Sequence, residues 1–391
     1  MIYTKTNAHH PQLDRRFFKN LSEAKLEQDS VYWYDQHDHV IRGTPFPVCV
    51  DDQHWEHLRN DPTSKILMYY GDEYFNILDI NDWANTLKLR NINPAQVYIV
   101  TTDENWVRWA TDRLAERDII GANIQSVNIL MGRVKEQEYG TEYTHRFSSL
   151  SRNFTDWRLN VYAEFCNRGL LENFNYTFSN ICPYGNIVTT EHEEITKMVN
   201  SMGYDTSLEK FKSWISGIPY QLPDHSILEK LARGTYDTIK SAGIHFLIES
   251  HFDPFWTTAG LKGTMTPYAL SPAFPTEKTY KAISCRRPFI IFSTPQFLAE
   301  FKDLGYETFH PYINESYDEI EDDKTRLLAI ADEVERISKL SSDEFNVLLK
   351  NCESIAERNF NLFVKKKSEI GFNDKFSWVT QYLAAQPAQP Y

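Results

Sequence analysis

The sequence predicts an α/β protein with two domains, and three observations support this fold class. The chain has 391 residues, which is more than one ordinary hydrophobic core supports. Short apolar runs typical of buried strands alternate with segments of helical periodicity, which is the pattern of a mainly parallel sheet covered by helices. Hydrophobic residues make up 41% of the chain, which is enough for well-packed cores.

The alternation becomes clear from residue 65 onward. Three apolar runs have the composition of buried strands: KILMYY at 65–70, QVYIVTT at 96–102 and SVNILMG at 126–132. Between the last two, Asp103 has the chemistry of a helix start and precedes a segment with apolar residues at helical spacing. We therefore expect residues 1–140 to form an N-terminal α/β domain.

The polar segment VKEQEYGTEYTH (134–145) lacks hydrophobic periodicity, so the boundary between the domains is expected there. A second α/β domain follows over residues 145–372, beginning with the short strand FSSLS and ending with two long helices. Its buried strand IHFLIESHFDP (244–254) ends in polar residues, where binding sites of α/β proteins usually form. Residues 373–391 are expected to be a C-terminal tail.

Composition limits the classes of partner and compartment. The net charge of −13 argues against broad binding to nucleic acid or anionic membrane. The five cysteines are scattered and never form a CxxC pair, which favours a reducing compartment over a disulfide framework or a zinc site. The N-terminus lacks the apolar core of a signal peptide, and no apolar run approaches the roughly 18 residues of a membrane helix. We expect a soluble, cytoplasmic protein without a membrane span.

The stretch Ser271–Phe309 contains the strongest candidate for a ligand site. Pro275 and Thr276 precede a helix that opens with Glu277 and Lys278. A short strand is expected at the end of the whole stretch, in YETF. A helix N-terminus favours anions, because its first backbone N–H groups are unpaired and the peptide dipoles point their positive end there. A lysine at that end suits a diphosphate, and the carboxylate beside it could accept from ribose hydroxyls. The alternative is an ordinary solvated helix start.

The run TEKTYKAISCRRPFIIFSTPQFL, which begins at Thr276, resembles the nucleotide-sugar motif of α1,3-fucosyltransferases. It is closer still to glycosyltransferase sequences of bacteriophages and large DNA viruses. Their TEKTxKPI, PF(I/V)I, LGF-TF and ESYD blocks look like Thr276–Ile283, Pro288–Ile291, Leu304–Phe309 and Glu315–Asp318. The upstream FSSLSRNFTDWRLNVYAEFCNRGLL looks like the arginine block of that family without its proline-rich spacer, and Ala282 replaces a usual proline. By its charge alone, the acidic run around ESYD would be solvated surface.

The resemblance implies a glycosyltransferase of the GT-B arrangement, in which two Rossmann-like α/β domains face each other across a cleft. It implies that Lys278 and Arg152 contact the diphosphate of a nucleotide-sugar donor and that Glu277 binds the ribose. The chemistry agrees, because the leaving nucleoside diphosphate develops negative charge that lysine and arginine stabilise.

Three further residues are expected on the donor side. Thr276 belongs to the motif itself, and Arg158 belongs to the upstream block, although it could equally be a helix-surface residue. Glu249 ends the buried strand directly before the motif, where it could bind sugar or support other donor contacts.

The resemblance also implies inversion at the anomeric carbon, which requires a base for the acceptor hydroxyl. In a two-domain cleft that base would come from the N-terminal domain, where Glu73 follows one predicted strand and Asp103 follows the next. Asp103 is also a plain helix cap. No DxD metal motif is apparent, since Asp51-Asp52 and Asp79-Ile80-Asn81-Asp82 lack that spacing, and helix dipoles with basic side chains can replace a metal. We expect a metal-independent enzyme without a cofactor.

The predicted function is transfer of a sugar from a nucleotide-sugar donor to an acceptor hydroxyl. One alternative is a viral enzyme, acting in the host cytoplasm, whose acceptor is a hydroxymethylated base in DNA. The other is a non-catalytic sugar- or nucleotide-binding module of the same fold. No glycine-rich dinucleotide motif, P-loop or nucleophile elbow is present. The sequence indicates neither the donor's base and sugar, nor the acceptor (a glycan, a protein or a modified DNA base), nor an oligomeric state.

Overall fold

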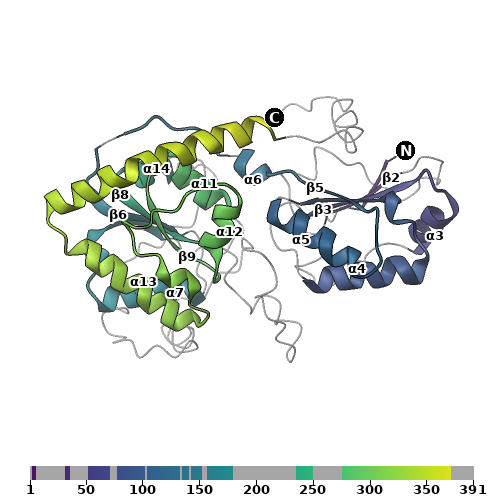
Figure 1. Ribbon diagram of the computed structural model, residues 1–391, viewed down its shortest axis with the longest axis horizontal. Helices are drawn as coiled ribbons and strands as arrows, with labels where there is room; N and C mark the ends of the chain where they lie inside the picture. Colours follow the sequence, from purple (N-terminus) through teal and green to yellow (C-terminus); the bar gives the residue numbers. More distant parts are fainter. Residues whose placement is uncertain are drawn as a thin grey trace. The chain divides into compact units, whose positions relative to one another are not determined.

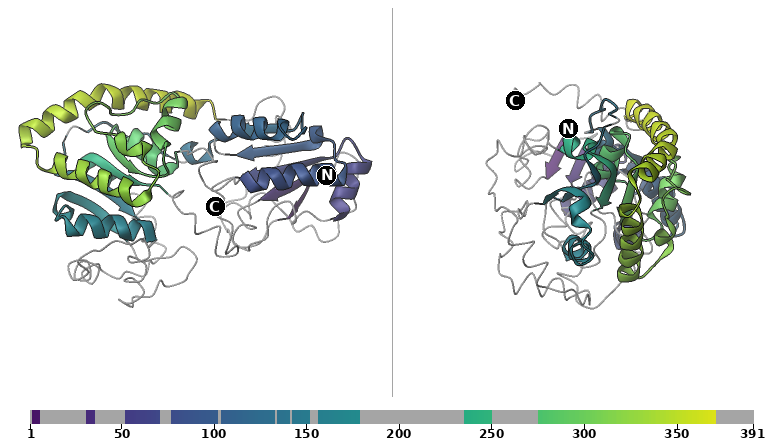
Figure 2. Two further views of the ribbon diagram at one scale, coloured as in Figure 1. Left: turned by 60° about the horizontal axis from the view of Figure 1, so that its bottom comes forward. Right: turned by 90° about the vertical axis from the view of Figure 1, so that its left-hand side faces the viewer.

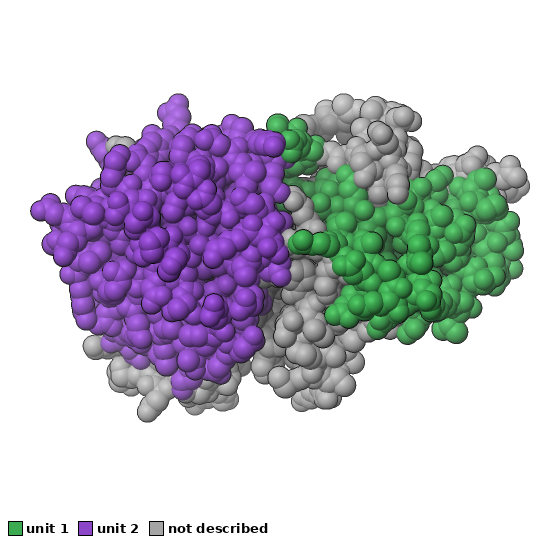
Figure 3. Space-filling view, in the orientation of Figure 1, with its two compact units in different colours: residues 1–132, 254–272, 367–391 green, residues 133–253, 273–366 purple. Residues whose placement is uncertain are grey.

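The computed structural model describes residues 2–5, 31–35, 52–70, 77–101, 104–132, 134–140, 142–151, 156–178, 235–249 and 275–370. These residues form two compact α/β units, each built on a parallel sheet (Figure 1, Figure 3). Unit 1 holds the described residues up to 132 and from 367 on, and unit 2 holds those between. The predicted α/β class with parallel sheets is confirmed, and the facing of two domains across a cleft stays a prediction.

The sheet of unit 1 has five parallel strands in the order β1-β2-β3-β4-β5. They are β1 (Ile2–Lys5), β2 (Val31–Asp35), β3 (Lys65–Tyr70), β4 (Val97–Thr101) and β5 (Asn123–Ser126). The helices are α3 (Asp52–Asn60), α4 (Ile77–Arg90), α5 (Glu104–Ala115) and the short α6 (Ile129–Gly132), with a 3-10 turn at Pro94–Gln96. Parallel strands need a crossover between them, and α4 and α5 provide two such crossovers in sequence.

The core of unit 1 lies where three helices cover one face of this sheet. Ile66 of β3 and Ile99 of β4 pack in one buried cluster with Trp55, Trp83 and Leu114 from α3, α4 and α5. The two indole rings meet edge to face with centroids 6.4 Å apart. Figure 2 shows α4 and α5 along the sheet from a second direction.

The strand expected at 126–132 is an incorrect prediction. The strand is β5, which ends at Ser126, and the apolar run that follows begins α6 at Ile129. The reason is local, because the Asn128 side chain accepts from the Met131 backbone N–H at 2.9 Å and so favours a helical turn. Val127 still donates to the Thr101 carbonyl, which ends the pairing with β4.

The sheet of unit 2 has four parallel strands in the order β7-β6-β8-β9. They are β6 (His145–Ser151), β7 (Phe174–Phe178), β8 (Ala242–Ile248) and β9 (Phe289–Phe292). The main helices are α7 (Asp156–Asn167), α11 (Glu277–Ser284), α12 (Phe297–Asp303), α13 (Asp323–Ser338) and α14 (Ser342–Ser368), with 3-10 turns at Leu171–Asn173 and Ser316–Glu319. All seven residues of β8 are buried, as expected for a strand covered on both faces.

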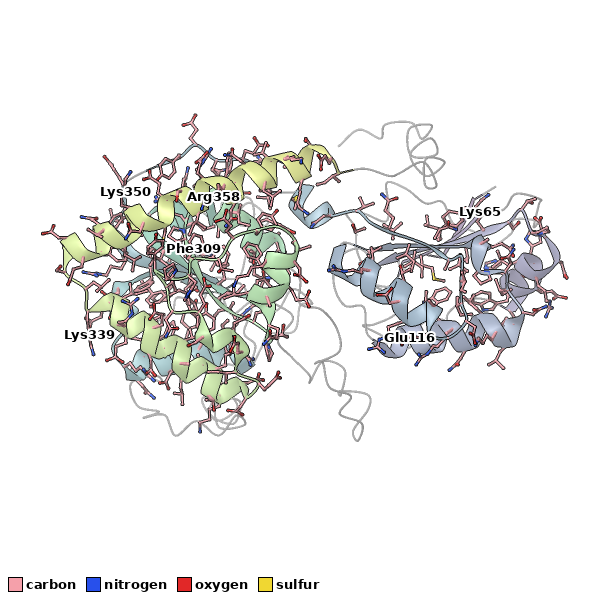
Figure 4. All side chains as sticks on the ribbon, in the orientation of Figure 1. Lys65, Glu116, Phe309, Lys339, Lys350 and Arg358 are labelled. Carbon is pink, nitrogen blue, oxygen red and sulfur yellow. The ribbon has the colours of Figure 1, made fainter. Side chains whose placement is uncertain are left out.

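Aromatic side chains fill the interior of unit 2 on both faces of its sheet. On one face Phe165 of α7 meets Phe246 of β8 edge to face at 4.9 Å. On the other, Phe289 of β9 meets Phe309, which Figure 4 labels, with ring centroids 5.2 Å apart. Gly243 lets α14 approach β8, because a Cβ there would lie 2.8 Å from the ring of Phe345.

No strand forms in the YETF segment at 306–309, where the sequence predicted one. Side chains, rather than a neighbouring strand, accept from the backbone N–H groups of Glu307 and Phe309. Glu307 donates to the Asn359 side chain at 2.8 Å, and Phe309 donates to the Glu315 carboxylate at 2.7 Å. The rings of Tyr306 and Phe301 stack with their centroids 4.7 Å apart.

The acidic run around ESYD was expected to be solvated surface, and this is incorrect for Asp318. Its buried carboxylate accepts from the backbone N–H groups of Leu298 and Ala299 and so caps α12. Gln296, at the N-cap position with φ of 64°, offers no side-chain cap of its own. Buried Arg326 completes the arrangement by donating to the Ser293 carbonyl at the end of β9 (3.1 Å) and to two carbonyls of the acidic loop.

The segment expected to link the domains belongs to unit 2, where side chains from other parts of the same unit contact it. Arg286 donates to the Gln137 carbonyl at 3.0 Å, and Arg287 donates to the Glu142 carbonyl at 3.2 Å. The Tyr139 hydroxyl lies 3.2 Å from the Glu353 carboxylate on α14. These contacts come from both the end of α11 and the middle of α14. No helix in the described ranges combines the length and the apolar character that crossing a membrane requires.

Replacing Arg326 by Met is expected to lower the free energy of unfolding by about 3 kcal/mol, because it leaves the buried Ser293 carbonyl and two partly buried carbonyls without their donor. Arg358 is a matched control from the same unit, since it pairs with Glu307 but its side chain is 54% exposed. Arg358→Met should leave the free energy of unfolding nearly unchanged. Urea denaturation of both variants measures the difference, and equal losses would contradict the role assigned to Arg326.

Candidate functional site

The T-E-K motif lies at the carboxyl edge of the unit 2 sheet, where binding sites of parallel α/β folds form. β8 ends at Ile248, and Glu249 follows it with its backbone N–H bonded to the Phe292 carbonyl of β9 at 3.1 Å. Contacts from the Glu249 side chain reach the first turn of α11. Strand end and helix start are thus joined directly.

Glu249 has no exposed surface, and both of its carboxylate oxygens are used. Oε1 accepts from the Thr276 backbone N–H at 3.1 Å and from the Thr279 hydroxyl at 2.6 Å. Oε2 accepts from the Thr276 hydroxyl at 2.6 Å and lies 3.6 Å from the Lys278 Nζ. A buried carboxylate is tolerated only with such a set of donors around it.

This arrangement changes what the start of α11 offers a ligand. The Thr276 N–H is bonded to Glu249, and the Lys278 N–H donates to the Thr276 hydroxyl at 3.3 Å. Protein acceptors therefore already occupy part of the N-terminal N–H set on which the anion argument rested. What the motif presents outward is two charged side chains, those of Glu277 and Lys278.

The Lys278 ammonium lies between two carboxylates. Its Nζ is 3.6 Å from Glu249 Oε2 and 3.7 Å from Glu277 Oε1, and it donates to the Thr276 hydroxyl at 3.3 Å. The side chain is 19% exposed. Neither carboxylate lies as close as the 2.7–2.9 Å of a typical charge-assisted hydrogen bond, so an incoming phosphate oxygen could make the shorter contact.

Glu277 is the exposed partner, with 36% of its side chain accessible. Burial of the rest would raise its pKa, but the charges of Lys278 and Lys281 and its own backbone N–H lower the pKa to about 2. The carboxylate is thus ionised at neutral pH and acts only as an acceptor. An acceptor of this kind suits the hydroxyls of a ribose.

Arg158 of α7 is buried, so the alternative of a helix-surface residue is incorrect. Burial raises the pKa of Tyr162, so the phenol is neutral, while the charge of Arg158 acts to lower that pKa. The Tyr162 hydroxyl lies within hydrogen-bonding distance of the Ser149 and Ser151 hydroxyls of β6, at 3.1 and 3.2 Å. β6 is the neighbour of β8, and the register that pairs Ser149 with Phe246 puts Ser151 beside the end of β8.

The structure brings four predicted donor residues together: Glu249, Thr276, Glu277 and Lys278. Thr279, which completes the set around Glu249, was missed, although its position three residues after Thr276 puts both on one helix face. Whether these residues bind a donor stays a prediction.

Three predicted residues lie outside the described ranges: Arg152, Glu73 and Asp103. Both carboxylates follow neighbouring parallel strands, since β3 ends at Tyr70 and β4 at Thr101. Their assignment as catalytic bases stays a prediction. Within the described residues no group of three His, Cys, Asp or Glu side chains could hold a metal ion, and metal independence also stays a prediction.

Comparison with known proteins gives likeness only at the level of structures. No protein-family model matches the chain, and none of the curated proteins matches it. The solved structures with some likeness include the GtfA/B complex, with 10% identity, a TM-score of 0.41, and coverage of 88% of this chain and 58% of that one. The chain therefore spans less than two thirds of that protein's length.

Two other solved structures have similarly low likeness to this chain. An α,α-trehalose 6-phosphate synthase from Burkholderia multivorans has 10% identity and a TM-score of 0.42, covering 94% of this chain and 74% of that chain. T4 phage BGT in complex with its UDP-glucose substrate has 13% identity and a TM-score of 0.34, covering 92% and 82%. All three TM-scores lie below 0.5, so these likenesses assign neither a family nor a substrate to the chain.

The low pKa of Glu277 predicts a specific pH dependence. A carboxylate whose pKa is about 2 in the folded chain and 4.5 ordinarily contributes stability above pH 4.5, and that stability is lost as the pH falls from 4.5 toward 2. Glu277→Gln removes this contribution. Between about pH 5 and about pH 3 the variant should therefore lose less unfolding free energy than the wild type, by urea denaturation. Equal losses in both proteins would show that the neighbouring lysines do not hold Glu277 ionised.

Proposed function

We propose that this protein is a glycosyltransferase that moves a sugar from a nucleotide-sugar donor to an acceptor hydroxyl, with inversion and without a metal ion. One observation carries the proposal. Lys278 and Glu277 stand side by side at the start of α11, partly exposed at the carboxyl edge of a parallel sheet, with buried Glu249 behind them. The resemblance of this motif to nucleotide-sugar motifs supports the same function.

In the proposed complex the donor's diphosphate lies against Lys278. A compact ammonium suits phosphate oxygens, and the charge that develops on the leaving diphosphate strengthens the contact in the transition state. The ionised Glu277 accepts hydrogen bonds from the ribose hydroxyls. Arg152 and Arg158, from the upstream block, are proposed to add positive charge on the β6 side of the same edge.

The reaction is a direct displacement. The acceptor oxygen attacks the anomeric carbon, and its proton passes to a carboxylate of unit 1, for which Glu73 and Asp103 are the candidates. The bond between the anomeric carbon and the phosphate oxygen breaks, and its electron pair leaves on the nucleoside diphosphate. The atoms and charges balance without a cofactor. Inversion follows because attack and departure take place on opposite faces of the sugar.

The acceptor is proposed as a glycan, lipid or protein hydroxyl rather than a hydroxymethylated base in DNA, because the net charge of −13 disfavours a polyanionic partner. A cytoplasmic location is proposed because the five cysteines are scattered along the sequence and form no CxxC motif.

Isothermal titration with UDP, GDP, TDP and CMP tests the donor site. One of these nucleotides should bind the wild type, and Lys278→Ala should weaken that binding about tenfold or more, because it removes the charge facing the phosphates. Lys302→Ala is the matched control, since it removes one exposed lysine from α12 of the same unit. Thermal unfolding of each variant checks its fold. If no nucleotide binds, or if Lys278→Ala does not change the Kd of the nucleotide that binds, the proposed donor site is wrong.

Turnover separates an enzyme from a binding module. The donor for this test is the nucleotide-sugar that carries the nucleobase identified by titration. With it, either Glu73→Gln or Asp103→Asn should lower kcat by about 10²–10⁴ and leave the donor Kd unchanged, as loss of a general base does. Donor hydrolysis or sugar transfer is followed by release of the nucleoside diphosphate. If neither variant affects kcat, the general base is another residue. A wild type that binds donor and neither hydrolyses nor transfers it is a non-catalytic module.

A further inference from the structure

The structure assigns Glu249 the role of a positioning residue: its buried carboxylate fixes the Lys278 ammonium and the first turn of α11 where the donor's diphosphate is bound. This inference rests on the proposed function for the identity of the ligand. Of the two roles that the sequence left open for Glu249, contact with the sugar and support of other donor contacts, it favours the second.

The first step of the argument is burial. Glu249 has no exposed surface, so no ligand atom can reach its carboxylate without displacing Thr276 or Thr279. Both threonines are buried as well, at 3% and 0% exposure. The exposed part of the motif is the Lys278 and Glu277 side chains. Glu249 can therefore influence a ligand only through the groups that it holds.

The second step is that the two carboxylate oxygens of Glu249 have different partners. Oε1 takes the Thr276 backbone N–H and the Thr279 hydroxyl, which fixes the helix relative to the end of β8. Oε2 takes the Thr276 hydroxyl and faces the Lys278 ammonium at 3.6 Å. One carboxylate thus fixes the backbone position of the first turn of α11 and the position of the Lys278 ammonium.

The third step is electrostatic. The ammonium of Lys278 has a second carboxylate, Glu277, at 3.7 Å on its exposed side. Without the charge of Glu249, the balance of attraction on the ammonium shifts toward Glu277, and that carboxylate is the group proposed to bind ribose. A ligand would then have to separate Lys278 from Glu277 before either could serve it. Glu249 offsets the pull of Glu277 on the ammonium, because the two carboxylates lie at nearly equal distances from Nζ.

Two variants separate charge from structure. Glu249→Gln keeps the shape of the side chain and, through its amide oxygen, the contact to the Thr276 N–H, but it removes the charge facing Lys278 and puts an amide NH₂ where Oε2 accepted from the Thr276 hydroxyl. Thr279→Val keeps the charge and removes one hydrogen bond to the same carboxylate. A merely structural role predicts that both act alike, whereas a positioning role predicts that only Glu249→Gln affects what Lys278 does.

The first measurement needs no nucleotide. Acetylation of Lys278 by acetic anhydride, followed by peptide mass spectrometry, should be several-fold faster in Glu249→Gln than in the wild type, because the amine is no longer held against a buried carboxylate. Thr279→Val should match the wild type. Equal rates in all three proteins would overturn the inference. If Glu249→Gln does not fold, Glu249→Asp provides the same test, since its shorter side chain withdraws the carboxylate from Nζ.

The second measurement uses the nucleoside diphosphate that binds the wild type and the corresponding uncharged nucleoside. Glu249→Gln should raise the diphosphate Kd about tenfold and leave the nucleoside Kd unchanged, and Thr279→Val should change neither. Tighter diphosphate binding in Glu249→Gln would mean that Glu249 only competes for the ammonium, and would overturn the inference. If the wild type binds no diphosphate, the proposed function fails, while the acetylation rates still decide the role of Glu249.

Discussion

The buried carboxylate of Glu249 is the interaction on which the described part of the candidate site depends. Removing a carboxylate from water costs on the order of several kcal/mol, and only a full set of donors offsets that cost. Here the donors are a backbone N–H, two threonine hydroxyls and a lysine ammonium, all from the first turn of α11. The strand end therefore cannot move independently of the helix start. The Lys278 ammonium lies between the two carboxylates, 3.6 Å from Glu249 and 3.7 Å from Glu277.

The neighbouring strand end uses the same physical device. Asp318 caps α12 from a distant loop, and Arg326 joins the end of β9 to that loop through backbone carbonyls. In both places a buried charged side chain connects segments far apart in the chain, and both lie at the carboxyl edge of the unit 2 sheet. Such connections favour a rigid edge, which is what a site that must align a diphosphate and a ribose requires.

Much of the fold could be predicted from the sequence, because strands and helices leave different periodicities in apolar residues. The predicted strand at KILMYY is β3 (Lys65–Tyr70), and two long C-terminal helices are present as α13 and α14. The predictions that failed involved single side chains that compete with the pattern. Asn128 turns an apolar run into α6, and the contacts of Asn359 and Glu315 replace a strand at 306–309. Periodicity carries no information about such contacts.

By itself the sequence determined the α/β class with parallel sheets, and it placed Glu277 and Lys278 at the start of a helix, because these depend on local patterns of a few residues. Only the tertiary structure decided that Arg158 is buried. It also decided that Asp318, from an acidic run expected to be solvated, is a buried cap of α12. It also decided that Glu249, 27 residues before Thr276, accepts from its backbone N–H and hydroxyl. Burial and contacts across that separation arise from packing of the whole sheet edge, which no local pattern encodes.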